Sequence, residues 1–275
     1  MSMYAERFHS VFPSRPPILG MVHLHALPGS PTFGGSLQDV ITKALADAQT
    51  LADAGVDALL VENLHDYPYY PETIEPETVA SATVCAKAVA EEIDLPMGIN
   101  ILRNSWKASL GIAAAVGAKF IRLNILTDAM ITDQGMINGA AHLVSRYRKQ
   151  IGADDVLILA DLLTKHAAPL VERPVPVIAA DMIKRGGADG IIIAGHDSSQ
   201  PASQDRIREI KDAIPDAPVI MGSGMTVEHA PTYAKVADGA VFGWGSKPNA
   251  DMLQPVSSDM ATEFANAWTT GLQAR

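Results

Sequence analysis

Short apolar runs alternate with longer segments of helical periodicity along most of the chain. Between the runs, apolar residues recur every three or four positions, as in Leu37, Ile41, Ala44 and Leu45, which is typical of a helix with one buried face. Runs that are apolar at nearly every position are typical of parallel strands covered on both sides. The eight runs that we interpret as strands lie at residues 17–22, 56–60, 95–99, 118–121, 156–160, 188–192, 218–221 and 239–242.

Four of the eight predicted strands follow the same local sequence, in which a glycine ends a helix and an apolar run begins at once. Gly55, Gly117 and Gly187 mark three of these junctions, and Ala237-Asp238-Gly239 marks the fourth. The alternation with the other four strands indicates a repeated β/α/β/α unit. Eight such strands favour a closed barrel over an open sheet. The sequence therefore predicts an α/β fold, a single (β/α)8 TIM barrel.

The composition agrees with one large α/β domain. The chain has 275 residues, of which 48% are hydrophobic, and this is enough for one sizeable core. We expect a single domain over residues 1–275, with residues 1–16 as an N-terminal extension and residues 248–275 as a C-terminal loop and helix.

The charge and the cysteine content exclude some classes of partner. The net charge is −10, without the clustered Lys and Arg that bind a nucleic-acid backbone, so no nucleic acid is expected. The single cysteine, Cys85, cannot form an intrachain disulfide, and no apolar run approaches the roughly 18 residues of a transmembrane helix. We expect a cytoplasmic homo-oligomer with no transmembrane segment, and peripheral contact with a membrane stays open.

Polar and charged residues gather where the predicted strands end. In a parallel barrel these ends meet at one mouth, which carries the active site in barrel enzymes. Charged side chains at such positions must be paired or must bind something. The candidates for substrate binding are His23, Asn63, Asn100, Arg122, Asn124 and His196, and the candidates for catalysis are Glu62, Asp161, Lys165 and His166.

Two carboxylates are the candidates for general acid or base. Asp161, directly after a buried run, is preferred, and Glu62 is second, because a carboxyl in a dry mouth can have a raised pKa. Arg122 either pairs with one of them or holds an anionic substrate. Lys165 can bind phosphate, polarise a carbonyl or form a Schiff base, and the sequence does not choose among these.

Two glycine-containing loops follow the seventh and eighth predicted strands. In TIM barrels the loops after these strands are the usual phosphate site, because bare glycine amides can approach the anion closely. The substrate is therefore predicted to carry a phosphate. The residues assigned to this site are Gly222, Ser223, Gly224, Gly243 and Ser246.

Two histidines at the end of the first strand suggest an alternative chemistry. His23 and His25 would face the same way on an extended segment, as in the metal sites of many barrel hydrolases. The eighth strand ends at Phe242-Gly243-Trp244-Gly245 without the carboxylate that such a site uses. No metal or other cofactor is therefore assigned, and a divalent metal on His23 and His25 is kept as the alternative.

The longest loop at the predicted mouth lies at residues 127–138. It exceeds the usual length of a βα loop, and its polar and glycine content favours a lid or a wall of the pocket, although a surface excursion is nearly as good an interpretation.

Seven separated motifs, in order, resemble the BtpA/SgcQ family, whose members look like ribulose-phosphate-binding-type barrels. The resemblance spans roughly residues 17–250 and implies a barrel with a common ligand, but no settled reaction. The family is named for a factor in photosystem I biogenesis, and it also has members in organisms without photosynthesis. The motifs are Gly20-Met21-Val22-His23-Leu24 with Leu27-Pro28-Gly29-Ser30-Pro31, Val61-Glu62-Asn63, residues 98–104, Phe120-Ile121-Arg122-Leu123-Asn124, Thr132-Asp133-Gln134-Gly135, Asp161 with Lys165-His166-Ala167, and Gly222-Ser223-Gly224.

The expected function is that of an enzyme acting on a small phosphorylated sugar or nucleotide-like metabolite. The reaction would be a proton transfer or the cleavage of a glycosidic or C–C bond, in the lyase, isomerase or glycosyl-bond-cleaving class. The alternatives are a non-catalytic biogenesis factor for a membrane complex such as a photosystem, and a metal-dependent hydrolase.

Overall fold

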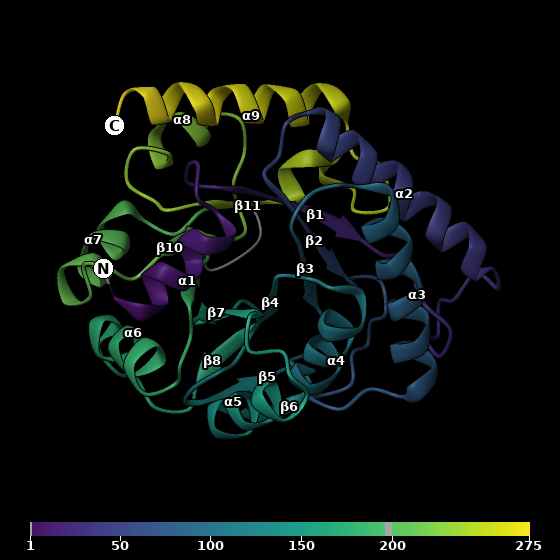
Figure 1. Cartoon of the computed structure of the whole chain (residues 1–275), viewed down its shortest axis with the longest axis horizontal. Helices are drawn as coiled ribbons and strands as arrows, with labels where there is room; N and C mark the ends of the chain where they lie inside the picture. The colour runs from purple at the N-terminus through teal and green to yellow at the C-terminus, as the bar shows by residue number, and fades with distance from the viewer. Residues whose placement is uncertain (1, 196–199) are drawn as a thin grey trace.

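Eight parallel strands close into a barrel in the computed structural model, which describes residues 2–195 and 200–275. This confirms the predicted TIM barrel, and each observed strand lies within about three residues of its predicted run. Figure 1 shows the strands at the centre of the molecule. The strands, in their order around the barrel, are β1 (Ile18–His23), β11 (Ala240–Phe242), β10 (Val219–Met221), β9 (Gly190–Ile193), β7 (Leu157–Leu162), β4 (Phe120–Leu123), β3 (Met97–Asn100) and β2 (Ala58–Glu62).

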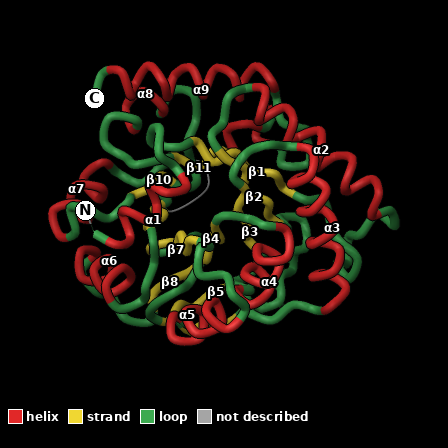
Figure 2. Tube along the Cα trace, viewed as in Figure 1, coloured by secondary structure: helices red, strands yellow, loops and turns green. Residues whose placement is uncertain are grey.

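Helices surround the barrel and cover the outer face of its strands (Figure 2). No helix in the described ranges has both the length and the apolar character needed to cross a bilayer. Between β10 and β11 the assigned helix is the single turn of α8 (Ala230–Tyr233). Pro231 lies in this first turn, where a residue without an amide hydrogen is tolerated. The other helices of the ring are α2 (Leu37–Asp53), α3 (Pro76–Glu92), α4 (Trp106–Val116), α5 (Ala141–Gln150), α6 (Val175–Lys184), α7 (Gln204–Ala213) and α9 (Ser258–Gln273).

A small antiparallel sheet, separate from the barrel, replaces the long loop expected at residues 127–138. Strands β5 (Ala129–Thr132) and β6 (Gly135–Asn138) form a hairpin, and β8 (Ala167–Pro169) pairs with the outer edge of β5. The inner side of this sheet packs through Met130 and Ile137. The segments that follow β4 and β7 are thereby joined beyond the carboxyl ends of these strands.

The barrel interior is apolar toward the amino-terminal ends of its strands, and α1 (Met3–Val11) closes this end of the barrel. Phe8 and Phe12 pack into the same cluster as Leu60, Phe120 and the other inward-facing side chains of the strands. The rings of Phe12 and Phe120 have their centroids 5.8 Å apart. Gly98 is required beside them, because a Cβ at this position would lie 2.1 Å from the Phe120 ring. The N-terminal extension therefore completes the core.

An aspartate at three of the four repeated helix-to-strand junctions anchors the neighbouring strand. Asp57 accepts the amide of Ile18 at 2.8 Å, and Asp189 accepts the amide of Ile158 at 2.8 Å. Asp238 does the same for Val219 at 2.9 Å. The fourth junction has Lys119 at this position. In these three copies of the sequence repeat, the aspartate forms a hydrogen bond to the neighbouring strand, which helps set the register of the two strands.

Asp189 is the most deeply buried of these carboxylates, and its substitution should destabilise the fold. Its side chain also pairs with Arg7 at 2.6 Å and with Arg148 at 3.1 Å. Asp189→Asn should lower the free energy of unfolding in urea by about 3 kcal/mol, because both guanidiniums lose their counter-charge in a buried site. The control is Asp205→Asn, whose 80% exposed side chain pairs with Arg208; this substitution should change the free energy of unfolding by less than about 1 kcal/mol. Equal losses in the two variants would contradict the role given to Asp189.

Candidate functional site

Polar side chains replace the apolar layers at the carboxyl ends of the strands. His23 ends β1, Glu62 ends β2 and Asn100 ends β3, while Arg122 and Asp161 lie within β4 and β7. Side chains alternate along a strand, and each of these residues is two or four positions beyond an inward-facing residue. Arg122 therefore points into the barrel, which decides between the two orientations that the sequence left open.

A bidentate ion pair joins Arg122 to Asp161. The Nε and Nη2 atoms of Arg122 donate to the two carboxylate oxygens of Asp161 at 2.9 and 3.1 Å. The Asn124 amide donates to the same carboxylate at 2.9 Å, and the Thr164 hydroxyl at 3.1 Å. Burial opposes the charge of Arg122, but Asp161 and Glu62 outweigh it and raise the pKa of the guanidinium. Asp161 is thus held by four donor contacts within the protein, which suits a group that positions Arg122.

Glu62 is the carboxylate whose proton affinity is shifted. Only 6% of this residue is exposed, and burial raises the pKa of its carboxyl although Arg122 and Lys165 act in the opposite direction. The Asn100 amide donates to Oε2, and Arg122 Nη1 lies 3.9 Å from the same oxygen. A carboxyl that keeps its proton to higher pH is suited to general acid or base chemistry.

His23 lies beside Glu62, with Nε2 3.8 Å from Glu62 Oε1. Burial, with the nearby charge of Lys247, holds the pKa of His23 well below its ordinary value, so the ring is neutral at physiological pH. Its Nδ1 atom is buried and has no hydrogen-bond partner among the described residues. The neutral ring of His23 also lines a cavity at this end of the barrel.

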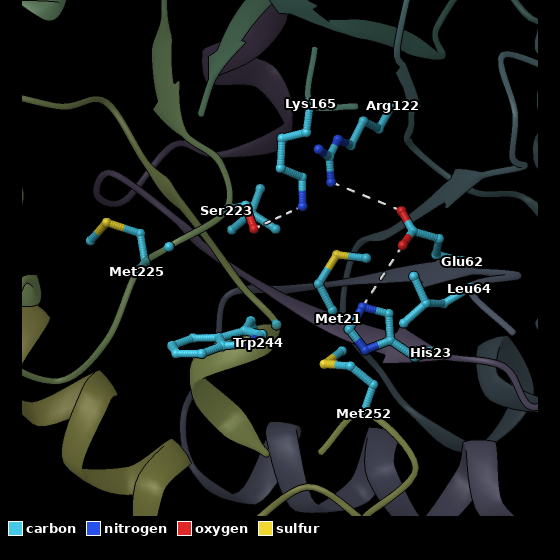
Figure 3. Close-up of a pocket in the computed structure, with 13 residues that line it drawn as sticks. Met21, His23, Glu62, Leu64, Arg122, Lys165, Ser223, Met225, Trp244 and Met252 are labelled. Carbon is cyan, nitrogen blue, oxygen red and sulfur yellow. Dashed lines mark hydrogen bonds and ion pairs between the residues drawn. The ribbon is translucent and has the colours of Figure 1, made fainter. Parts of the chain in front are cut away.

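A cavity of about 120 Å³ opens at this point (Figure 3). Lys165, in the loop after β7, lies across the cavity from His23, and its Nζ donates to Ser223 Oγ at 2.9 Å. Burial and the charge of Arg122 lower the pKa of the Lys165 ammonium. The lining residues are Met21, His23, Glu62, Leu64, Arg122, Lys165, Ser223, Gly224, Met225, Val241, Gly243, Trp244 and Met252.

A second cavity of about 330 Å³ shares one wall with the first. Glu62, Leu64, Arg122 and Lys165 line both, so the two form one continuous mouth. The far wall of the second cavity consists of Tyr69, Leu102, Arg103, Asn124, Asp133, Thr164 and His166.

Arg103 joins the β5–β6 hairpin to the loop after β7. Its Nη1 donates to Asp133 at 3.0 Å, in the turn of the hairpin, and its Nη2 donates to the carbonyl of Lys165. The hairpin thereby forms part of the second cavity, in agreement with the predicted contribution of residues 127–138 to the pocket.

The residues of the two glycine loops do not all reach the cavity. Ser223, Gly224 and Gly243 line it. The Gly222 amide instead donates to the carbonyl of Ile193 at 2.6 Å, and the fully buried Ser246 donates its hydroxyl to the carbonyl of Gly243 at 2.6 Å. Gly222 and Ser246 therefore stabilise the conformation of the two loops without lining the cavity.

The absence of a side chain at Gly243 keeps the cavity open. A Cβ at this position would lie 2.8 Å from Met21 Cγ and 3.2 Å from His23 Cε1. A substitution of Gly243 would therefore displace the side chains on which the cavity depends.

Three other predicted residues lie outside this arrangement. Asn63 holds a loop, since its Oδ1 accepts the Leu102 amide at 2.7 Å. His25 lines neither cavity and packs against His65, with ring centroids 5.4 Å apart. His196 lies outside the described residues. Within residues 2–195 and 200–275, no group of three His, Cys, Asp or Glu side chains is arranged to hold a metal ion.

Several residues of the mouth were not identified from the sequence. Met21 could have been found from strand alternation, because it lies two positions before His23. Met252 comes from the C-terminal loop and belongs to no motif, so only the fold brings it to the cavity. The buried pair between Lys247 and Asp47, at 2.6 Å, was also missed because its members are 200 residues apart.

Comparison with known proteins places the chain in a family. The model of the BtpA family matches residues 14–270. The photosystem I biogenesis protein BtpA of Synechocystis is 37% identical over 96% of this chain and 92% of its own length. An uncharacterized protein of Pyrococcus abyssi is 41% identical over 90% of this chain and 94% of its own.

Solved structures of barrel enzymes resemble the fold at low sequence identity. A tryptophan synthase structure from M. tuberculosis has a TM-score of 0.62 at 15% identity and covers 97% of this chain and 99% of that chain. N-(5'-phosphoribosyl)anthranilate isomerase of Pyrococcus furiosus has a TM-score of 0.54 at 13% identity, covering 92% and 98%. These likenesses concern the fold alone. The family match and the relatives show that the chain belongs to the BtpA family.

Proposed function

We propose that this protein is an enzyme that binds a small phosphorylated metabolite at the barrel mouth and uses Glu62 as its general acid or base. The observation that carries the proposal is the position of Glu62. It is a buried carboxyl with a raised pKa that lines the same cavity as the cation Lys165. The reaction is a proton transfer, either at carbon or at the oxygen of a bond being cleaved, in an isomerase, lyase or glycosyl-bond-cleaving enzyme.

Lys165 and the loop after β10 supply the phosphate site. Lys165 Nζ and Ser223 Oγ, 2.9 Å apart, are two donors that can contact the same anion. Gly224, adjacent in the same loop, and Gly243 after β11 allow backbone to approach it closely. These are the loops after the seventh and eighth barrel strands, where many TIM barrels bind phosphate.

Arg122 and Asp161 serve as a fixed charge pair beneath the substrate. Because Asp161 is already held by Arg122, Asn124 and Thr164, it is a positioning residue in this proposal. This reverses the preference from the sequence, in which Asp161 came before Glu62. His23, which is neutral and lines the same cavity, contacts the reacting part of the substrate.

A second candidate function is a non-catalytic role in assembly. The name of the Synechocystis relative, at 37% identity, favours it. The state of Glu62 favours the enzyme, because a buried carboxyl with a raised pKa lowers stability at neutral pH. Enzymes commonly retain residues that lower stability because their activity requires them, whereas a non-catalytic assembly protein has no such requirement for Glu62.

Phosphate binding should depend on Lys165. Ribose 5-phosphate at about 100 times its dissociation constant should raise the melting temperature of the wild type by roughly 5 °C, as linkage predicts. Lys165→Met should lose most of this shift, because it keeps the side-chain volume and removes the charge. Lys184→Met, at an exposed position at the end of α6, is the control and should keep it. No shift with any phosphorylated compound would reject the proposed ligand class.

The ionisation of Glu62 should lower stability as the pH rises. Below about pH 4.5, the ordinary pKa, Glu62 is protonated in both states, and stability is lost as the pH rises through the higher folded pKa. Gln mimics the protonated form. The melting temperature of Glu62→Gln minus that of the wild type should therefore become more positive from about pH 4 to about pH 8. The exposed Glu92→Gln should show a smaller change, and equal changes would contradict a buried, perturbed Glu62.

Turnover should require Glu62. When phosphorylated metabolites are incubated with the protein and followed by NMR, Glu62→Gln should consume the substrate at least about 100-fold more slowly than the wild type. The variant should still show the phosphate-induced thermal shift, because Lys165 and Ser223 are unchanged. Equal rates in the two proteins would remove Glu62 from the mechanism.

A further inference from the structure

One wall of the first cavity is apolar and contains the partly buried indole of Trp244. In Figure 3 the indole of Trp244 lies below the side chain of Ser223, and His23 and Met252 lie to one side of it. The remaining apolar side chains of the lining are Met21, Leu64, Met225 and Val241. Three residues of the cavity lining, Met21, Met225 and Met252, are methionines, whose thioethers contact aromatic rings favourably and adapt to their shape.

The indole belongs to a segment that is held on both sides. Trp244 begins the short helix η1 (Trp244–Ser246) directly after β11. Ser246 is fully buried, and its carbonyl accepts the amide of Ser257 at 2.9 Å. The next residue, Lys247, is 2% exposed and pairs with Asp47 at 2.6 Å. The segment that carries Trp244 is therefore already ordered without a ligand, which reduces the conformational entropy lost on binding.

The size and the chemistry of the cavity favour a flat ring. The first cavity, of about 120 Å³, is continuous with the second, of about 330 Å³, so the mouth has room for a ring the size of benzene, which occupies a cavity of roughly 150 Å³, and for its phosphate. The hydroxyl groups of a sugar would need hydrogen-bond partners on every side, and methionine, leucine and valine side chains provide weak acceptors or none. The polar groups of the cavity lie instead at its edges, with Lys165 and Ser223 on one and Glu62 and His23 on another.

We propose that the substrate of this site carries an aromatic or heteroaromatic ring joined to its phosphate, and that the ring stacks on Trp244. This rests on the proposed function, since it assumes the phosphate site at Lys165 and Ser223. A ring on the indole, with its phosphate on Lys165, places its far edge toward Glu62 and His23. Trp244 is then a specificity-determining residue that selects ring-bearing phosphates over phosphates of saturated sugars.

The test compares phenyl phosphate with cyclohexyl phosphate by isothermal titration calorimetry. The two esters have the same charge and nearly the same size, and they differ in aromaticity. The wild type should bind phenyl phosphate about fivefold more tightly, as expected for one stacking contact. In Trp244→Leu this preference should fall to about one, while cyclohexyl phosphate keeps its affinity within about twofold. Trp106→Leu, in α4 and outside the cavity, is the control and should keep the preference.

The possible outcomes separate this inference from the function on which it rests. If neither ester nor inorganic phosphate binds, the phosphate site itself is wrong. If both esters bind equally well to the wild type and both lose affinity in Lys165→Met, the phosphate site stands and the ring is rejected. A preference for phenyl phosphate that persists in Trp244→Leu also rejects stacking on this residue.

Discussion

The buried guanidinium of Arg122 is the constraint on which the arrangement of the mouth depends. A charge that is 7% exposed must be compensated, and the bidentate contact with Asp161 does this. Asp161 uses its hydrogen-bonding capacity in this way, with Asn124 and Thr164 completing its contacts. Glu62 lies farther from the guanidinium, at 3.9 Å, so burial prevails and its proton is retained to higher pH. One ion pair thus distinguishes the carboxyl group that binds the guanidinium from the one whose pKa is raised by burial.

The apolar core at the amino-terminal end of the barrel supports the polar residues at the carboxyl-terminal end. Phe8 and Phe12 fill the amino-terminal end, and Phe120 occupies the space that Gly98 leaves open. The next inward positions toward the mouth on the same strands are polar. Because the packed layers below cannot collapse, side chains such as Arg122 and Glu62 project into a mouth whose shape is set by the strands. The apolar core at one end of the barrel therefore supports the polar mouth at the other end.

The barrel strands were predictable because their signals are local. An apolar run after a helix-ending glycine identifies a buried strand wherever it occurs. The β5–β6 hairpin lacked such a signal, since its strands are short and partly exposed, and β8 pairs with it from a segment about 30 residues away. The membership of Trp244 in the cavity was not predictable either. It depends on η1 and on the distant contact between Lys247 and Asp47.

The sequence by itself determined the barrel, the end of it that carries the polar residues, and most of the side chains gathered there. Strand alternation and chain direction are enough for this, because all parallel strands end at the same mouth. Only the tertiary structure decided which carboxylate is neutralised by Arg122 and which keeps a raised pKa. It also placed Lys165 against Ser223 and brought Met252 to the cavity. These outcomes depend on distances between side chains of different strands and loops, and burial and charge pairing act through those distances.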